Sequence, residues 1–183
     1  DADEIAAIAR AAAITDAALA GSLDQWRVGM TEIAAAWEIE RRMREMGAQG
    51  VGFELIVQSG PNSARPHARP SERALQEGEP IVVDIGARVD GYVSDMTRTI
   101  CLGKPTAKFR KVYGIVLEAQ QAALAAVTAG AVNTDVDAAA RAIITNAGFG
   151  KKFGHGVGHG VGLQIHEQPR LSPLVKEPKP LVA

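Results

Sequence analysis

Apolar residues recur at helical spacing in the first part of the chain. Residues 3–19 combine this spacing with good helix formers, which predicts a helix. A second helix is predicted within GMTEIAAAWEIERRMREMG, with Thr31 as its N-cap and Gly47 as its terminator. The β-rich segment VGFELIVQSG, residues 51–60, then predicts a strand. The pattern therefore leads from two helices into extended chain.

The same order of elements returns after Pro105. Residues 107–130 predict a long helix, and NTDVDAAARAIITNAGFG predicts a second one. Thr134 is expected to cap this helix, with Asp137 at the capping-box position and Gly148 at its end. The shared order favours an internal duplication, although one common supersecondary unit used twice would give the same pattern.

A β-hairpin is predicted between the two halves, because two β-rich runs flank the turn signal RVDG. If the turn is centred between the Val and Asp of RVDG, Asp84 and Asp95 lie directly opposite one another. Their Cβ atoms would then be roughly 5 Å apart. If the Asp-Gly pair forms the centre, the two aspartates are diagonal neighbours. Both placements put them on one face.

Facing carboxylates carry an energetic cost. Asp84 lies within IVVDIG, where an unpaired buried carboxylate is unfavourable, and two facing carboxylates repel unless a cation or proton lies between them. Two metal ions about 3.5–4 Å apart would remove this cost and could support hydrolysis. The alternative is that Asp95 is a strand-end or turn residue and that backbone donors satisfy Asp84.

The segment FGHGVGHGVGLQIHE contains three of the four histidines, His155, His159 and His166. His155 and His159 have the i, i+4 spacing of a helical metal pair, but the glycines disfavour a helix. The glycines instead predict extended or bulged backbone that lets a ligand approach closely. Because His159 and His166 have opposite parity along a strand, a bulge or bend must intervene if both face one site.

Composition narrows the class of protein. The chain has 183 residues, enough for a real core, and its net charge of −1 gives no electrostatic case for nucleic acid or an anionic membrane surface. No apolar run approaches the roughly 20 residues that span a bilayer, and no signal-peptide pattern is visible. The single cysteine, Cys101, fits a reducing compartment, so a cytoplasmic location is expected.

Two motifs, VVDIGARVDGYVSDMTRT and GHGVGHGVGLQIHE, together resemble the pita-bread metallopeptidases, the family of methionine aminopeptidases, prolidases and aminopeptidases P. NSARPHARPS upstream fits the same pattern, and HGVGHG followed by GLQIHE is closer to the Xaa-Pro branch. The resemblance implies an α/β fold of the α+β type, with a curved, mainly antiparallel sheet covered by helices. Residues 1–183 would form one catalytic-type domain with pseudo-two-fold halves, about 1–103 and 104–183.

The resemblance also implies a metal site. Asp84 and Asp95 would bridge or chelate two divalent metal ions, and His159 would be the imidazole ligand of one of them. Such ligands suit manganese, cobalt, iron or zinc. Thr97 lies on the same strand face as Asp95 and would orient that carboxylate.

The remaining implied site residues are His67, His155 and His166. They would line the substrate pocket and donate hydrogen bonds to the peptide and its tetrahedral intermediate. The implied activity is hydrolysis of Xaa-Pro bonds at peptide N-termini or in dipeptides, by attack of a metal-bridged hydroxide. Two alternatives stay open: a methionine aminopeptidase, and a non-catalytic pita-bread module that binds a peptide or protein.

The sequence departs from the family pattern at its C-terminal end. The family's site also uses two glutamates after the histidine cluster, and one of them acts as general base. The chain ends at EPKPLVA, and neither Glu167 nor Glu177 occupies a matching position. The chain is therefore expected to be C-terminally incomplete, to hold at most one metal firmly and to be inactive as written. An unfinished sheet would also expose an edge, which invites association into a homodimer.

Overall fold

The structure is a computed structural model that describes residues 1–65 and 68–182. It divides into two units. Unit 1 comprises Asp1–Thr106 and Val161–Ile165, and unit 2 comprises Ala107–Gly160 and His166–Ala183. The sequence placed the boundary between halves near residue 104. The segment Val161–Ile165, which follows the second half's strand in the chain, belongs to unit 1.

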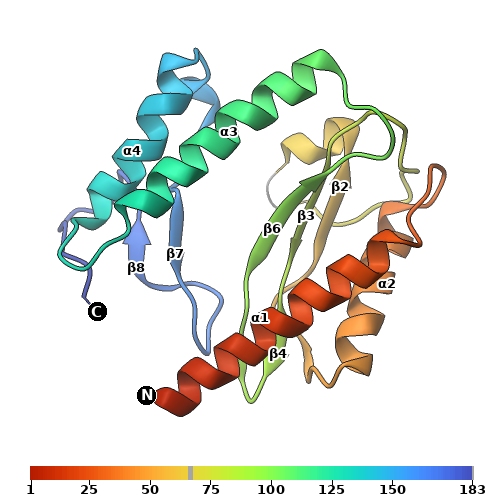
Figure 1. The fold of residues 1–183 in the computed structure, drawn as a ribbon, viewed down its shortest axis with the longest axis horizontal. Coiled ribbons are helices and arrows are strands. Elements are labelled where there is room, and N and C mark those ends of the chain that lie inside the picture. Colours follow the sequence, from red (N-terminus) through yellow and green to blue (C-terminus); the bar gives the residue numbers. More distant parts are fainter. Residues whose placement is uncertain (66–67, 183) are drawn as a thin grey trace. The chain divides into compact units, whose positions relative to one another are not determined.

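The described residues of unit 1 form two α-helices and six short strands. The strands form two antiparallel sheets, in the orders β1-β4-β5 and β2-β3-β6. Figure 1 shows both helices on the same side of these strands. The elements are α1 (Ala2–Leu23), α2 (Glu32–Glu45), β1 (Gly50–Val51), β2 (Ile56–Ser59), the 3-10 helix η1 (Gly60–Ala64), β3 (Ile81–Ile85), β4 (Ala87–Val89), β5 (Tyr92–Val93) and β6 (Met96–Ile100).

The core of unit 1 lies between α2 and β3. Alternate residues of β3, Ile81, Val83 and Ile85, are fully buried, as are Ile39 and Met43 of α2. Each such side chain contributes roughly 1.5–3 kcal/mol when it leaves water. The opposite face of β3 is only half-buried. The helices therefore cover one face of the strands and leave the other available for polar groups.

Helix α1 is long and apolar enough to cross a membrane by length and composition alone. The expectation that no stretch approaches such a length is therefore wrong. One such helix near the N-terminus is weak support for a membrane span, because a core helix has the same composition. Thr15 of α1 is buried and accepts a hydrogen bond from Ala87 N–H at 3.0 Å, and its Oγ1 lies 2.8 Å from Ser94 Oγ. These contacts attach α1 to the strands of unit 1.

Unit 2 consists of two helices and a two-stranded antiparallel sheet. Figure 1 shows α3 and α4 packed side by side, and Ala119, Ala123, Val136 and Ala140 form their buried contact. The elements are α3 (Ala107–Ala126), α4 (Asn133–Asn146), the 3-10 helix η2 (Gly150–Lys152), β7 (Gly158–Gly160) and β8 (Glu167–Leu171).

The N-termini of α2 and α4 test the N-caps that the sequence predicted. Thr31 caps α2 as predicted, accepting a hydrogen bond from Ala34 N–H at 3.1 Å. The predicted cap of α4 by Thr134 is wrong: the N-cap is Val132, without a side-chain hydrogen bond. Asn133 instead uses its amide to bind the chain near residues 170 and 179, and α4 begins two residues earlier than the capping-box pattern indicates.

The two halves share backbone hydrogen bonds whose donors are 101 residues apart in the sequence. Gly29 N–H donates to Leu75 O at 2.9 Å, and Gly130 N–H donates to Leu181 O at 2.8 Å. Both glycines have a positive φ that favours glycine, 91° and 87°. The helix ends match too: the pairs are Ala48 N to Met43 O and Phe149 N to Ile144 O. The repeated pattern supports the internal duplication expected from the sequence.

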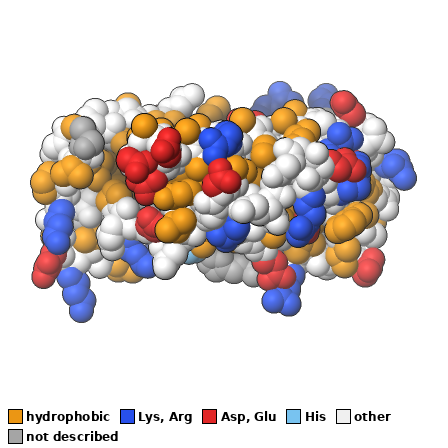
Figure 2. Space-filling model, turned by 90° about the horizontal axis from the view of Figure 1, so that it is seen from below, with side chains coloured by type: hydrophobic (Ala, Val, Ile, Leu, Met, Phe, Trp, Pro, Cys, Tyr) orange, Lys and Arg blue, Asp and Glu red, His pale blue; other side chains and the backbone are white. Residues whose placement is uncertain are grey.

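The surface carries both signs of charge. On the face drawn in Figure 2, acidic and basic side chains occur side by side, with hydrophobic side chains between them. Ion pairs one helical turn apart occur on α2, such as Arg44 with Glu40, and each such exposed pair contributes about 0–1 kcal/mol. This mixture agrees with the net charge of −1.

Candidate functional site

The register of the β3–β6 hairpin follows from its turn. Asp90 and Gly91 form the turn centre, with φ values of 51° and 84°. Asp84 therefore pairs with Thr97 on β6. Asp95 lies two residues before Thr97, so the second of the two sequence-derived placements holds, and the aspartates are diagonal neighbours.

Both aspartates lie on the face of the hairpin that the helices leave uncovered. Ser94 is 4% exposed, and Met96 packs against the core, so the alternating residues Asp95 and Thr97 point the other way. Asp84 shares this face because it pairs with Thr97. The predicted common face of the two carboxylates is therefore present in unit 1.

Gly86 allows the two strands to approach closely next to the aspartates. A Cβ at this position would lie 1.9 Å from Ser94 O, so no side chain fits there. Ser94 N–H donates to Ala87 O at 3.0 Å, which keeps the register on both sides of this point. Gly86 was not singled out in the sequence, although its place in IVVDIG between two β-rich runs is the signal that could have identified it.

Thr97 orients a carboxylate, but not the predicted one. Its Oγ1 donates a hydrogen bond to Asp84 Oδ1 at 2.8 Å, whereas the sequence predicted Asp95 as its partner. The register explains the difference, because Thr97 and Asp84 are directly opposite and cross-strand partners are closer than residues two apart on one strand.

His159 and His166 lie together in unit 2. The β7–β8 pairing shifts register between His159 and Gly160: His159 pairs with Arg170, but Gly160 pairs with Glu167. This is the irregularity that the opposite parity of the two histidines required. Their ring centroids are 4.4 Å apart, with an interplanar angle of 60°. The sequence required a bulge or bend if both histidines face one site, and this bulge is present between β7 and β8.

The ring nitrogens of two histidines have defined roles. His159 Nδ1 lies 3.0 Å from Gly160 O, and His155 Nδ1 lies 2.8 Å from Gly156 O. A carbonyl oxygen only accepts, so Nδ1 is the donor in each ring and the lone pair of the neutral imidazole is on Nε2. A metal-binding histidine typically has this arrangement, with its other ring nitrogen bonded to a carbonyl.

The glycines around the histidines make room for backbone. A Cβ on Gly160 would lie 2.2 Å from Gln168 O, and one on Gly156 would lie 2.7 Å from Leu171 O. Strand β8 and its register shift therefore need glycine at both positions. The sequence predicted that the glycines let a ligand approach closely. At Gly156 and Gly160, the neighbouring strand β8 lies in that space instead.

The predicted metal ligands come from both units. Asp84 and Asp95 belong to unit 1 and His159 to unit 2. Within residues 1–65 and 68–182, no three His, Cys, Asp or Glu side chains form a group that could hold a metal ion. The convergence of the three ligands stays a prediction. Their chemistry, two carboxylates and an imidazole with its lone pair on Nε2, fits the hard to borderline divalent metals. His67 lies outside the described residues.

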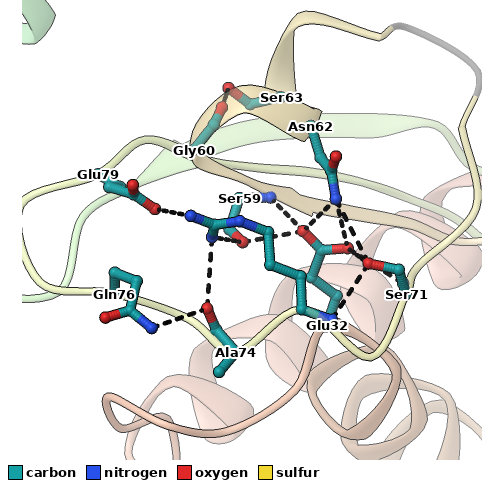
Figure 3. Close-up of polar contacts among 10 residues, drawn as sticks. Glu32, Ser59, Gly60, Asn62, Ser63, Ser71, Ala74, Gln76 and Glu79 are labelled. Atoms are coloured by element: carbon teal, nitrogen blue, oxygen red, sulfur yellow. Dashed lines mark hydrogen bonds and ion pairs between the residues drawn. The ribbon is translucent and has the colours of Figure 1, made fainter.

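A buried carboxylate that the sequence did not single out lies at the start of α2. Glu32 is fully buried, and Figure 3 shows Ser59, Asn62 and Ser71 converging on it. Ser59 donates from N–H at 2.7 Å and from Oγ at 2.8 Å, and Ser71 does so at 3.0 and 2.6 Å. Asn62 Nδ2 adds longer contacts of 3.2 and 3.3 Å. Arg73 completes the cluster with a hydrogen bond to Ser59 Oγ at 2.6 Å.

The hydrogen bonds of Glu32 decide its ionisation. Burial by itself raises the pKa of Glu32, but the hydrogen bonds from Ser71 and Ser59 outweigh burial and hold the pKa below its ordinary value of 4.5. The ionised carboxylate therefore ties together both ends of the segment between residues 59 and 71. His67 lies within this segment of the sequence, outside the described residues.

The fold and the motif residues are those of the pita-bread metallopeptidase class. The model of metallopeptidase family M24 matches residues 6–182. A curated relative, the Xaa-Pro dipeptidase of Pyrococcus furiosus, is 41% identical over 170 residues, which are 93% of this chain and 49% of that protein. The chain belongs to metallopeptidase family M24.

Solved structures give the same result. The X-Pro aminopeptidase from Thermotoga maritima matches with a TM-score of 0.94 and 41% identity, over 98% of this chain and 51% of that chain. The dipeptidase PepE from Mycobacterium ulcerans matches with a TM-score of 0.94 and 40% identity, over 100% of this chain and 49% of that chain. The chain thus spans about half the length of the relatives it matches.

Proposed function

We propose that the protein is a metal-dependent peptidase that hydrolyses Xaa-Pro bonds at peptide N-termini or in dipeptides. The named relatives support this reaction over the methionine aminopeptidase alternative. The structural observation that carries the proposal is the pairing of His159 and His166, with Nδ1 of His159 bonded to Gly160 O. This leaves Nε2 of His159 as the ring nitrogen that can bind a metal.

Asp84, Asp95 and His159 would hold two divalent metal ions, of manganese, cobalt, iron or zinc. When bound, such ions lower the pKa of a shared water and polarise the scissile carbonyl. Thr97 supports this role by donating to Asp84 Oδ1, which fixes the orientation of the carboxylate. Chain connectivity supports it as well, because Gly162, three residues after His159, accepts from Val93 N–H at 2.9 Å.

The other histidines would bind the substrate. His155 and His166 would donate hydrogen bonds to the peptide and to the oxyanion that develops at the carbonyl carbon, and His67 would join them. The 4.4 Å between the rings of His166 and His159 supports a substrate group beside a metal ligand. At that place His166 would be close to the atoms that react.

Units 1 and 2 would act as one catalytic domain. The single cysteine supports a cytoplasmic location, since a reducing compartment does not select for disulfides. A homodimer is proposed from the short strands at the sheet edges, which can pair with a second copy. Light scattering after size exclusion would measure the mass of the native protein and test the dimer.

The test of the reaction uses native protein with Ala-Pro and with Met-Ala peptides as substrates. Cleavage of Ala-Pro that a chelator abolishes and a divalent metal restores is the expected result. The variant His159→Ala should lose metal and activity together, whereas Glu40→Gln, on the surface of α2, should keep both. Cleavage of Met-Ala alone, or of Ala-Pro with undiminished rate after chelation, would refute the proposal.

A further inference from the structure

A buried ion pair on α4 reaches the histidine segment. Asp137 is 1% exposed, and Arg141, one helical turn later, gives it two hydrogen bonds. Arg141 Nε donates to Oδ2 at 2.6 Å, and Nη2 donates to Oδ1 at 2.9 Å. Asp137 Oδ1 also accepts from Val157 N–H at 2.9 Å. Asp137 thus extends the pair to the backbone just before β7, instead of forming the predicted capping box.

Arg141 uses its remaining donors on the same segment. Nη1 donates to Phe153 O at 2.8 Å, and Nη2 donates to His155 O at 2.7 Å. The guanidinium also lies over the Phe153 ring, 4.2 Å from its centroid. The Phe153 ring in turn meets the His155 ring edge-on, with centroids 5.0 Å apart and an interplanar angle of 81°.

The pair therefore fixes the backbone around His155. Phe153 O, His155 O and Val157 N–H are alternate groups along the chain, and all three are bonded to Asp137 or Arg141. The peptide planes that follow Phe153, His155 and Gly156 therefore cannot turn without breaking one of these bonds. Val157 directly precedes β7, so the same bonds set the direction in which the chain enters the strand that carries His159.

The first half of the chain lacks this arrangement. The positions 101 residues earlier are Ala36 and Glu40, and Glu40 forms an exposed pair with Arg44 instead. A buried ion pair is weak support for stability, because desolvation offsets much of its attraction. The shared scaffold thus does not require the pair, which occurs in the half that carries the histidines.

We propose that Asp137 and Arg141 are positioning residues that set the ring orientation and tautomer of His155 and His159. The proposal rests on the proposed function for its catalytic meaning. Its structural content is separate: Asp137 holds the peptide between Gly156 and Val157, so Gly156 O lies where Nδ1 of His155 can donate to it. Val157 leads directly into β7, where Nδ1 of His159 donates to Gly160 O. Each neutral ring then carries its lone pair on Nε2.

The first variant is Arg141→Lys, and the matched control is Arg44→Lys on α2. Lysine keeps the positive charge but has one nitrogen, so it cannot bind Asp137 and two carbonyls in one plane. We expect kcat for Ala-Pro to fall about 10–100-fold in the Arg141 variant, the range for groups that orient metal ligands. The control should keep the wild-type kcat. Asp137→Asn, which retains an acceptor for Val157 N–H, serves as a second variant if Arg141→Lys folds poorly.

Ring ¹⁵N NMR of the histidines separates positioning from simple stability, and it needs no catalysis. The wild type should show Nδ1–H tautomers for His155 and His159, and the Arg141 variant should gain the Nε2–H form while staying folded. If the wild type does not cleave Ala-Pro but this tautomer change occurs, the proposed function fails and the positioning role stands. Unchanged ring signals in a folded variant would overturn the positioning role, whatever happens to kcat.

Discussion

The buried carboxylate of Glu32 gives the sharpest test of the structure. In Glu32→Gln, one carboxylate oxygen becomes an NH₂ group of almost the same size. That group must face either Ser59 or Ser71, each of which offers a backbone N–H and a hydroxyl to its own oxygen of Glu32. The hydroxyl can rotate to accept, but the backbone N–H cannot.

The magnitude follows from those contacts. A buried donor left unsatisfied costs about 1–3 kcal/mol, and the other hydrogen bonds lose their charge-assisted strength. Removing the charge also removes the cost of burying it, which offsets part of the loss. We expect about 3 kcal/mol less stability at pH 7, or roughly 6–12 °C in the unfolding midpoint of a chain this size. Urea unfolding followed by circular dichroism would measure the loss.

The direction of the pKa shift of Glu32 predicts how the stability effect of Glu32→Gln changes with pH. The pKa of Glu32 lies below its ordinary 4.5 in the folded protein, so the unfolded chain binds the proton first as pH falls. The carboxylate's contribution is complete above about pH 4.5 and is lost as pH falls through the folded-state pKa. The difference in unfolding free energy between wild type and Glu32→Gln should therefore become smaller below about pH 4.5. The control Glu40→Gln breaks an exposed pair with Arg44 and should cost only about 0.3–0.5 kcal/mol. Equal effects of the two variants, or a difference that stays constant from pH 7 to pH 3, would refute the reasoning.

Two further variants test the site within each unit. Thr97→Val removes the donor to Asp84 and should weaken divalent metal binding about tenfold in isothermal titration calorimetry, whereas Thr97→Ser, which keeps the hydroxyl, should bind like wild type. Gly160→Ala places a Cβ 2.2 Å from Gln168 O and should lower stability by about 2 kcal/mol in urea unfolding, whereas Gly154→Ala meets nothing within 4 Å and should not. Equal metal affinity of the two Thr97 variants, or equal stability of the two glycine variants, would contradict these contacts.

Local sequence rules predicted the turn of the hairpin and the need for a bulge between the two histidines. RVDG identified the turn because Asp-Gly tolerates positive φ at both positions, as Asp90 and Gly91 show. Two registers remained open, since both put the carboxylates on one face. The opposite parity of His159 and His166 required an irregularity, and the shift between β7 and β8 supplies it. The turn and the bulge depend on residues that are close together in the sequence, so both could be predicted from it.

The polar clusters could not be predicted in the same way. Glu32 looked like an ordinary acidic residue in the first turn of a helix, but its partners Ser59 and Ser71 lie 27 and 39 positions away. Asp137 matched a capping box, yet its partner outside the helix, Val157, lies 20 positions away. Local rules describe what a side chain can do for its own helix. Burial and the folded path of the chain decided which of these carboxylates served a distant segment instead.

The two halves differ in the buried polar residue at the start of the second helix. At the start of each second helix, a buried polar side chain binds the two segments that pack against it. Glu32, an acceptor only, meets the N–H groups of Ser59 and Ser71. Asn133 occupies the position 101 residues later and is both donor and acceptor. It meets Arg170 O at 3.0 Å and Lys179 N–H at 3.1 Å.

The change from glutamate to asparagine thus matches a change in what the neighbouring backbone presents, with the helix and its flanking glycines retained. One turn further along, the first half has Ala36, whereas the second has Asp137 with its arginine. That addition binds only the segment that leads to the histidines. A duplicated backbone therefore explains the elements that the halves share. The buried polar residues of the second helix, Glu32 in one half and Asn133 and Asp137 in the other, account for the different segments that each helix binds.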